Sequence, residues 1–176
     1  MRSAGIALAL LLATAPLYAQ ENEAQEKAEA AEAARNASGL AAAMKEAKVS
    51  LAAALKASEK EGMPISGKFE VEDGKLQLSV YTMKGDKFFE VIVDYKTGKI
   101  AKTEPITGGE DLDAAKAEAE AMAKTKRSLS DVVSGAEKAN PGYRAVSVTP
   151  EVENGAAQAD VALLKGAESK QVEEKL

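Results

Sequence analysis

The chain contains neither cysteine nor histidine, and these two absences exclude several kinds of chemistry. Its 176 residues include no Cys, no His and no Trp. Without cysteine there is no disulfide, thiol nucleophile or cysteine zinc site. Without histidine there is no Ser-His-Asp triad, histidine metal centre or imidazole proton shuttle. We therefore expect a protein that is not an enzyme, although a carboxylate-dependent or Ser-Lys enzyme stays open as an alternative.

Aromatic residues and basic charge are also scarce. Three Phe and four Tyr are the only aromatics, and the formal net charge is -5. An acidic chain lacks the basic footprint that binding to phosphates requires, so we expect no nucleic-acid partner. A core with so few aromatics and no disulfide predicts modest stability.

The N-terminal segment, from Met1 to Ala19, has the pattern of a secretory signal peptide. Arg2 precedes an apolar run over residues 4–15, and Ala19 stands before Gln20 at the expected cleavage position. The run is shorter than the roughly 20 apolar residues that a membrane-spanning helix needs. The pattern predicts a bacterial protein in the periplasm or the medium, with no stable membrane anchor.

A leader rich in Glu and Ala follows over residues 20–37. It has no apolar stripe, so we expect a solvated helix or a disordered segment. A partner-binding helix is the alternative interpretation.

The remainder predicts helices followed by antiparallel strands. Apolar residues recur at helical spacing from Leu40 to Leu55, as one helix or two joined helices that end near Pro64. Alternating strand patterns follow, with a hairpin signal at Asp73-Gly74.

The stretch from Lys87 to Ile100 is the clearest strand and turn of the chain. It alternates through Phe88 and Ile92 on one face and then breaks at Asp94, Thr97 and Gly98. An Asp side chain can accept bonds from turn amides, and Gly adopts positive φ without a steric cost. We interpret these three residues as turn-forming rather than as a ligand loop.

The second half of the chain repeats the first. The pairs Ser50-Leu51 and Glu59-Lys60 recur as Ser128-Leu129 and Glu137-Lys138. After a short insertion, Gly74 and Gly85 recur as Gly155 and Gly166. The repeat predicts two units, at residues 38–104 and 111–176, joined by a linker at residues 105–110.

The first unit resembles the PepSY domain. The match is carried by Val91, Val93, Asp94, Thr97, Gly98 and Ile100, with support from residues 69–71 and Gly74. The second unit is degenerate, because it lacks the D-x-x-T-G turn and a fourth strand. The resemblance implies an α+β fold of two tandem units, each with helices on one face of a small antiparallel sheet. It also implies a non-catalytic domain that regulates or inhibits peptidases.

The expected function is protein binding, with a peptidase or another envelope protein as the partner. Only one face of a small sheet can pack on helices, which leaves the second face for a partner or for packing between the units. The expected surface consists of Phe88, Ile92, Tyr81 and Tyr95. We expect no cofactor, no metal, and a monomer or weak homodimer.

A periplasmic protein that binds metal or a small ligand through surface carboxylates is the alternative function. Glu110, Asp111 and Asp113 are the candidate ligands, although capping of a helix explains them better. Four methionines suit copper by chemistry, but their scattered positions favour packing.

Overall fold

The computed structural model describes residues 38–176. The predicted signal peptide, its cleavage position between Ala19 and Gln20, and the leader at 20–37 lie outside these residues. Residues 38–43 are helical and continue into the 3₁₀ turn η1. The helices, η1 included, are η1 (Met44–Glu46), α2 (Leu51–Ser58), α3 (Gly109–Met122) and α4 (Leu129–Ala139). The strands are β1 (Met63–Glu72), β2 (Lys75–Lys84), β3 (Lys87–Val93), β4 (Ile100–Ile106), β5 (Arg144–Glu153), β6 (Ala156–Lys165) and β7 (Glu168–Lys175).

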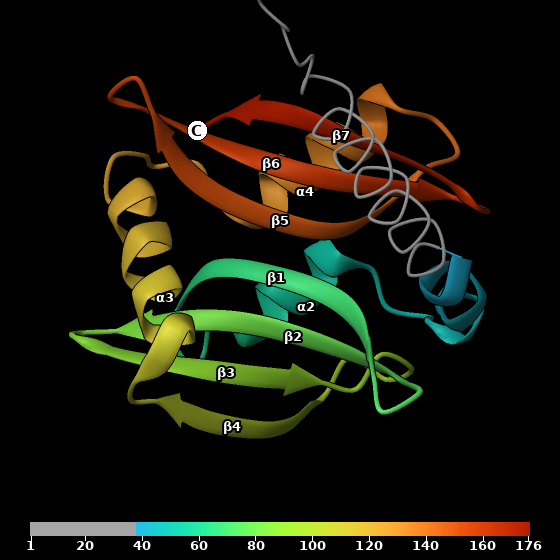
Figure 1. The fold of residues 1–176 in the computed structure, drawn as a ribbon, viewed down its shortest axis with the longest axis horizontal. Helices are drawn as coiled ribbons and strands as arrows, with labels where there is room; N and C mark the ends of the chain where they lie inside the picture. The colour runs from blue at the N-terminus through green and yellow to red at the C-terminus, as the bar shows by residue number, and fades with distance from the viewer. Residues whose placement is uncertain (1–37) are drawn as a thin grey trace, which may run out of the picture. The chain divides into compact units, whose positions relative to one another are not determined.

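All seven strands belong to one antiparallel sheet, in the order β4-β3-β2-β1-β5-β6-β7 (Figure 1). The expectation of two tandem units, each with its own sheet, is therefore wrong. The two halves join where β1 pairs with β5, at Gly67 opposite Val148 and Lys68 opposite Ser147. This pairing gives hydrogen-bonding partners to backbone groups of β1 and β5 that would lie at the unpaired edges of two separate sheets.

The joined halves share one hydrophobic core. Helices α2 and α4 pack on the same side of the sheet and also against each other, behind the strands in Figure 1. Leu51 and Leu55 of α2 and Val132 and Val133 of α4 are at most 1% exposed and belong to one cluster. A single cluster that includes residues from both halves is a second reason why they do not form independent units.

Matching positions of the repeat have the same local structure in the two halves. Strand β1 has an irregularity in its register between Pro64 and Ser66, and β5 has one between Ala145 and Ser147. The β1–β2 and β5–β6 hairpins both turn through a residue with positive φ followed by Gly, at Asp73-Gly74 and Asn154-Gly155. Two consecutive positive φ values suit a tight two-residue hairpin.

The helix starts are also alike in the two halves. Ser50 accepts the amide of Ala53 at the start of α2, and Ser128 accepts the amide of Asp131 at the start of α4, both at 3.2 Å. These serines are N-caps, which satisfy one of the free amides of a first helical turn.

The segment expected as a linker is partly regular structure. Strand β4 ends at Ile106 and α3 begins at Gly109, so residues 105–110 contain the end of a strand and the start of a helix. The second half contributes three strands and the first contributes four. Consequently the outer strands of the joined sheet are β4 and β7.

Candidate functional site

The sheet has a second face, opposite α2 and α4, that we call the open face. A Cβ built on Gly67 would lie 3.3 Å from Leu51 and Leu55, so Gly67 faces α2. Neighbouring residues of a strand alternate between faces, which places Ser66 and Lys68 on the open face. Ser66 contacts α3 there, through Glu118. Helix α3 thus lies on the open face and packs on β1, β5 and β6.

The strand register aligns side chains of the open face in rows across the sheet. One row in the first half consists of Ser66, Tyr81, Glu90 and Glu104. A neighbouring row consists of Lys68, Ser79, Ile92 and Lys102. In the second half, the row that matches Ser66 consists of Ser147, Ala162 and Gln171. The row that matches Lys68 consists of Thr149, Asp160 and Glu173. The open face therefore carries more carboxylates than cations.

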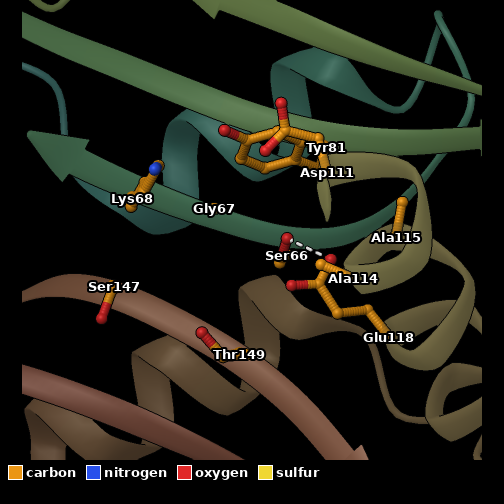
Figure 2. Close-up of a pocket in the computed structure, with 10 residues that line it drawn as sticks. All are labelled: Ser66, Gly67, Lys68, Tyr81, Asp111, Ala114, Ala115, Glu118, Ser147 and Thr149. Carbon is orange, nitrogen blue, oxygen red and sulfur yellow. Dashed lines mark hydrogen bonds between the residues drawn. The ribbon is translucent and has the colours of Figure 1, made fainter. Parts of the chain in front are cut away.

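A cavity of about 320 Å³ lies between α3 and the junction of β1 with β5, and we call it the α3 cavity. Figure 2 shows Lys68 and Glu118 at opposite ends of it, with Ser66 between them. It is lined by Ser66, Gly67, Lys68, Tyr81, Asp111, Ala114, Ala115, Glu118, Ser147 and Thr149. Both halves of the chain contribute, so the cavity exists only because they share a sheet.

Glu118 is the unusual carboxylate of this cavity. The Ser66 hydroxyl donates a hydrogen bond of 2.7 Å to Oε2 of Glu118. Burial raises the pKa of Glu118 from 4.5 to about 7, although the Ser66 bond and the charge of Lys68 oppose the shift. Glu118 therefore changes its charge near neutral pH, where an ordinary carboxyl group is fully ionised.

Lys68 and Tyr81 keep their ordinary charge states. Lys68 Nζ lies 2.8 Å from Oε2 of Glu70 and 5.8 Å from the centre of the Tyr81 ring. Burial disfavours the charged form of Lys68, but Glu70 and Tyr81 outweigh it, and the Lys68 pKa is raised. Burial raises the pKa of Tyr81 to about 12. Lys68 is thus a cation and Tyr81 a neutral phenol at neutral pH, and neither serves as a base.

Three of the four predicted surface residues lie together on the open face. Phe88 and Ile92 flank Glu90 on β3, and Tyr81 lies opposite Glu90 on β2. All three are partly buried. Phe88 is adjacent in register to Met83 and Ile106, which extends the apolar surface toward β4.

Tyr95, the fourth predicted surface residue, lies elsewhere. Its carbonyl oxygen accepts the amides of Lys48 and Val49 at 2.9 and 3.0 Å. Its side chain lines a different cavity, beside Val71 and Leu76. Leu76 belongs to the hydrophobic core, so Tyr95 does not extend the surface formed by Phe88 and Ile92.

Asp94, Thr97 and Gly98 form a turn between β3 and β4. Asp94 Oδ1 accepts the amides of Lys96 and Thr97 at 2.9 and 2.7 Å, and its carbonyl oxygen accepts the Gly98 amide at 2.8 Å. Gly98 has a φ of 73°. The bonds to Thr97 and Lys96 lower the pKa of Asp94. All of these polar groups are used within the turn.

The three carboxylates near the start of α3 have different surroundings. Glu110 and Asp111 are in the first turn of α3, and Asp111 also lines the α3 cavity. Asp113 lies 3.7 Å from Lys116. In the part of the chain that the structure describes, no group of three or more Asp or Glu is placed to hold a metal ion.

Sequence reasoning missed most of the α3 cavity. Lys68 and Glu118 come from different halves of the chain, and neither stands in a motif. Glu118 is one Glu of several in an alanine-rich helix, and its burial depends on α3 crossing to the open face. Ser66 and Ser147 are counterparts in the repeat, but only the pairing of β1 with β5 brings their two strands together.

Comparison with protein-family models, with curated proteins and with solved structures gave no match. Across residues 38–176, no helix has the length and apolar character needed to cross a membrane.

Proposed function

We propose that the chain is a non-catalytic module that binds a protein partner on the open face of its sheet. The observation that carries this proposal is the uneven covering of the sheet. Helices α2 and α4 cover one face, whereas α3 packs on β1, β5 and β6 of the other. Phe88, Glu90 and Ile92 of β3 keep part of their side-chain surface exposed on that face. Apolar and charged groups mixed in this way suit a protein interface.

The outer strands of the sheet are less suited to a partner than its face. Strand β4 contains Pro105 and a lysine at Lys102, and β7 is charged along most of its length. Proline lacks an amide donor, and charged side chains discourage a further strand from pairing. We therefore place the partner on the face rather than at an edge.

The class of partner is proposed from the sequence. The predicted signal peptide favours an envelope protein, and the resemblance of residues 38–104 to the PepSY domain favours a peptidase that the module regulates or inhibits. In the α3 cavity, Lys68 stays protonated and Tyr81 stays neutral at neutral pH, so neither of these two side chains is available as a general base.

Capture from a bacterial envelope extract tests this proposal. The immobilised protein is compared with Ile92→Ser, which makes the open face polar, and with Val71→Ser. Val71 is 44% exposed but belongs to the other face, so this variant is a matched control. We expect a partner that Ile92→Ser loses and Val71→Ser retains, with both variants folded by circular dichroism. A partner retained equally by both variants would contradict binding at the open face.

The α3 cavity favours a second candidate, a periplasmic protein that binds a small polar ligand. Its volume of about 320 Å³ is at the lower limit of ligand-binding pockets. Calorimetric titration with amino acids and with divalent metal ions distinguishes the candidates. Heats that disappear in Glu118→Gln, together with an empty pull-down, would favour this second function.

A further inference from the structure

We infer that the α3 cavity receives a lysine or arginine side chain of the partner, with Glu118 as the carboxylate that meets the cation. This inference rests on the proposed function, because it names the chemistry of what the open face binds. It adds a defined position on that face and a defined charge for the group that enters it.

The first argument is that Glu118 is partly buried without a cation bound to it. Its hydrogen-bonding partner is the Ser66 hydroxyl, which is neutral. The nearest cation of the cavity, Lys68, is bonded to Glu70 at 2.8 Å and lies over the ring of Tyr81. A buried carboxylate is stable when it is paired with a cation, and this one has a single neutral donor.

The second argument is the charge of the surroundings. Asp111 lines the α3 cavity and also a neighbouring hollow that contains Glu90 and Glu104. On the other side, Thr149 continues in register to Asp160 and Glu173. Lys68 is paired with Glu70 at 2.8 Å, and Glu104 is paired with Lys102 at 2.7 Å. Asp111, Glu118 and Glu90 are left in excess, so the surroundings of the cavity are acidic. A negative, partly enclosed site attracts a cationic group and repels an anionic one.

The third argument is the match between the cavity lining and a long basic side chain. Ala114 and Ala115 of α3 and the ring of Tyr81 supply apolar walls. Lysine and arginine have an aliphatic stem that packs on apolar surface and a charged end that needs polar partners. Glu118 and the hydroxyl group of Thr149 are acceptors for that end.

Binding of a cation beside Glu118 makes the affinity depend on pH. The ionisable groups that face the cavity are Lys68 on β1, Tyr81 on β2, and Asp111 and Glu118 on α3, while β5 contributes neutral hydroxyls. Lys68 stays protonated and Tyr81 stays neutral between pH 6 and 8. A cation favours ionised Glu118, so binding releases a proton and the affinity rises as the pH rises through that range.

A nuclear magnetic resonance titration of the full chain locates the site directly. The probes are n-butylguanidinium and n-butylammonium, which reproduce the ends of arginine and lysine, with butyrate as the anionic control. We expect saturable shifts of the amides of Ser66, Lys68, Glu118 and Thr149 with the two cations and none with butyrate. Shifts spread evenly over the surface carboxylates, or centred away from α3, would overturn the inference.

A pair of variants on α3 separates the role of Glu118 from general charge attraction. Glu118→Gln keeps the size of the side chain but removes its charge. Glu120→Gln makes the same change on a side chain that is 70% exposed and faces Lys124. We expect Glu118→Gln to weaken n-butylguanidinium binding about tenfold at pH 8, and Glu120→Gln to change it less than about twofold. Equal effects of the two variants would contradict a specific site.

The same variants distinguish this inference from the proposed function. If a captured partner depends on Ile92 but is unaffected by Glu118→Gln, the open face binds a protein and the cationic site is wrong. If the cations bind at Glu118 but no partner depends on Ile92, the site is correct and the proposed protein-binding function fails.

Discussion

Gly67 and Val148 stand opposite each other in the middle of the sheet, although they come from different halves of the chain. The offset that matches Gly74 with Gly155 in the repeat also matches Gly67 with Val148, so each residue faces its own counterpart. This is the arrangement of an approximate two-fold axis that passes through the sheet between β1 and β5. The hairpin turns and register irregularities, which occur in matching pairs, are related by this axis.

We expect a larger side chain at Gly67 to destabilise the protein. A Cβ there would approach Leu51 and Leu55 to 3.3 Å and the Ser79 carbonyl to 3.4 Å. Gly67→Val should lower the free energy of unfolding by about 1–3 kcal/mol, because extra methyl groups overpack the space under α2. Urea denaturation measures this. Gly39→Ala is the control, since a Cβ at Gly39 meets nothing within 4 Å; an equal loss in both variants would contradict the packing argument.

We expect stability to decrease as the pH rises from about 5 to about 7. The pKa of Glu118 is about 7 in the folded protein and 4.5 ordinarily, so in this range the folded state binds more protons than the unfolded state. Allowing for partial exposure to solvent, the decrease amounts to about 1–2 kcal/mol.

Denaturant unfolding at several pH values measures this decrease, with Glu118→Gln as the test variant. Glu118→Gln should remove this part of the pH dependence, and Glu120→Gln should keep it. A pH profile unchanged in Glu118→Gln would show that the effect comes from another group.

We expect Arg144 to hold the first helical segment against the second half of the sheet. Its guanidinium donates to the carbonyl oxygens of Met44, Ala47 and Val49, each at 3.3 Å. Arg144→Met should destabilise the protein by about 1–2 kcal/mol and leave these acceptors without that donor.

Hydrogen exchange can localise the effect of Arg144→Met. Amides of residues 38–49 should exchange faster, while those of β2 and β3 change less. Faster exchange that is uniform over all strands would indicate global rather than local loosening.

We expect the Asp94 turn to weaken at low pH. Hydrogen bonds from the Thr97 and Lys96 amides lower the pKa of Asp94, so the stabilisation is present at neutral pH and is lost as the pH falls through that lowered value. Asp94→Ala should lower the melting temperature at pH 7 and have a smaller effect once the wild-type carboxyl is protonated. Asp94→Asn, which keeps an acceptor, should lie between the two; equal melting temperatures of wild type and Asp94→Ala at pH 7 would contradict this role.

We expect the outer strand β4 to prevent association of the full chain. Replacing Lys102 and Pro105 together by Val removes the charge and restores an amide donor on an exposed edge. Sedimentation velocity should show a monomer for the wild type and larger species for the double variant. A double variant that remains monomeric would show that the edge is protected in another way.

Local signals predicted the hairpins, whereas the joining of the two halves had no such signal. Asp73-Gly74 has the positive φ values that its sequence predicts, and the strand predicted from Lys87 extends to Val93. The alternation of apolar residues in β1 and β5 indicates that each strand has a face directed toward the core. It does not indicate whether the edge of each strand is free or pairs with another strand. Nothing in Gly67 or Val148 specifies which strand lies beside them.

The candidate site was predictable to the same limited extent. Alternation placed Phe88 and Ile92 on the face away from the core, because both belong to one strand. Glu118 reaches Ser66 only through the crossing of α3 over the sheet, a long-range relationship that helical spacing does not encode. Tyr95 lies beyond the end of β3, beside Val71 and Leu76, so the alternation of that strand does not determine its face.

The junction of β1 with β5 makes the chain resemble a homodimer whose two subunits are covalently fused. A fragment that ends at residue 104 would leave the amides and carbonyls around Gly67 without their partners on β5. Strand β1 of a second copy of the fragment can take the place of β5 and pair with β1 in the antiparallel direction. We therefore expect the fragment to form dimers. In the intact chain the two sides differ in sequence, and residues of both halves line the acidic cavity that lies beside α3 at this junction.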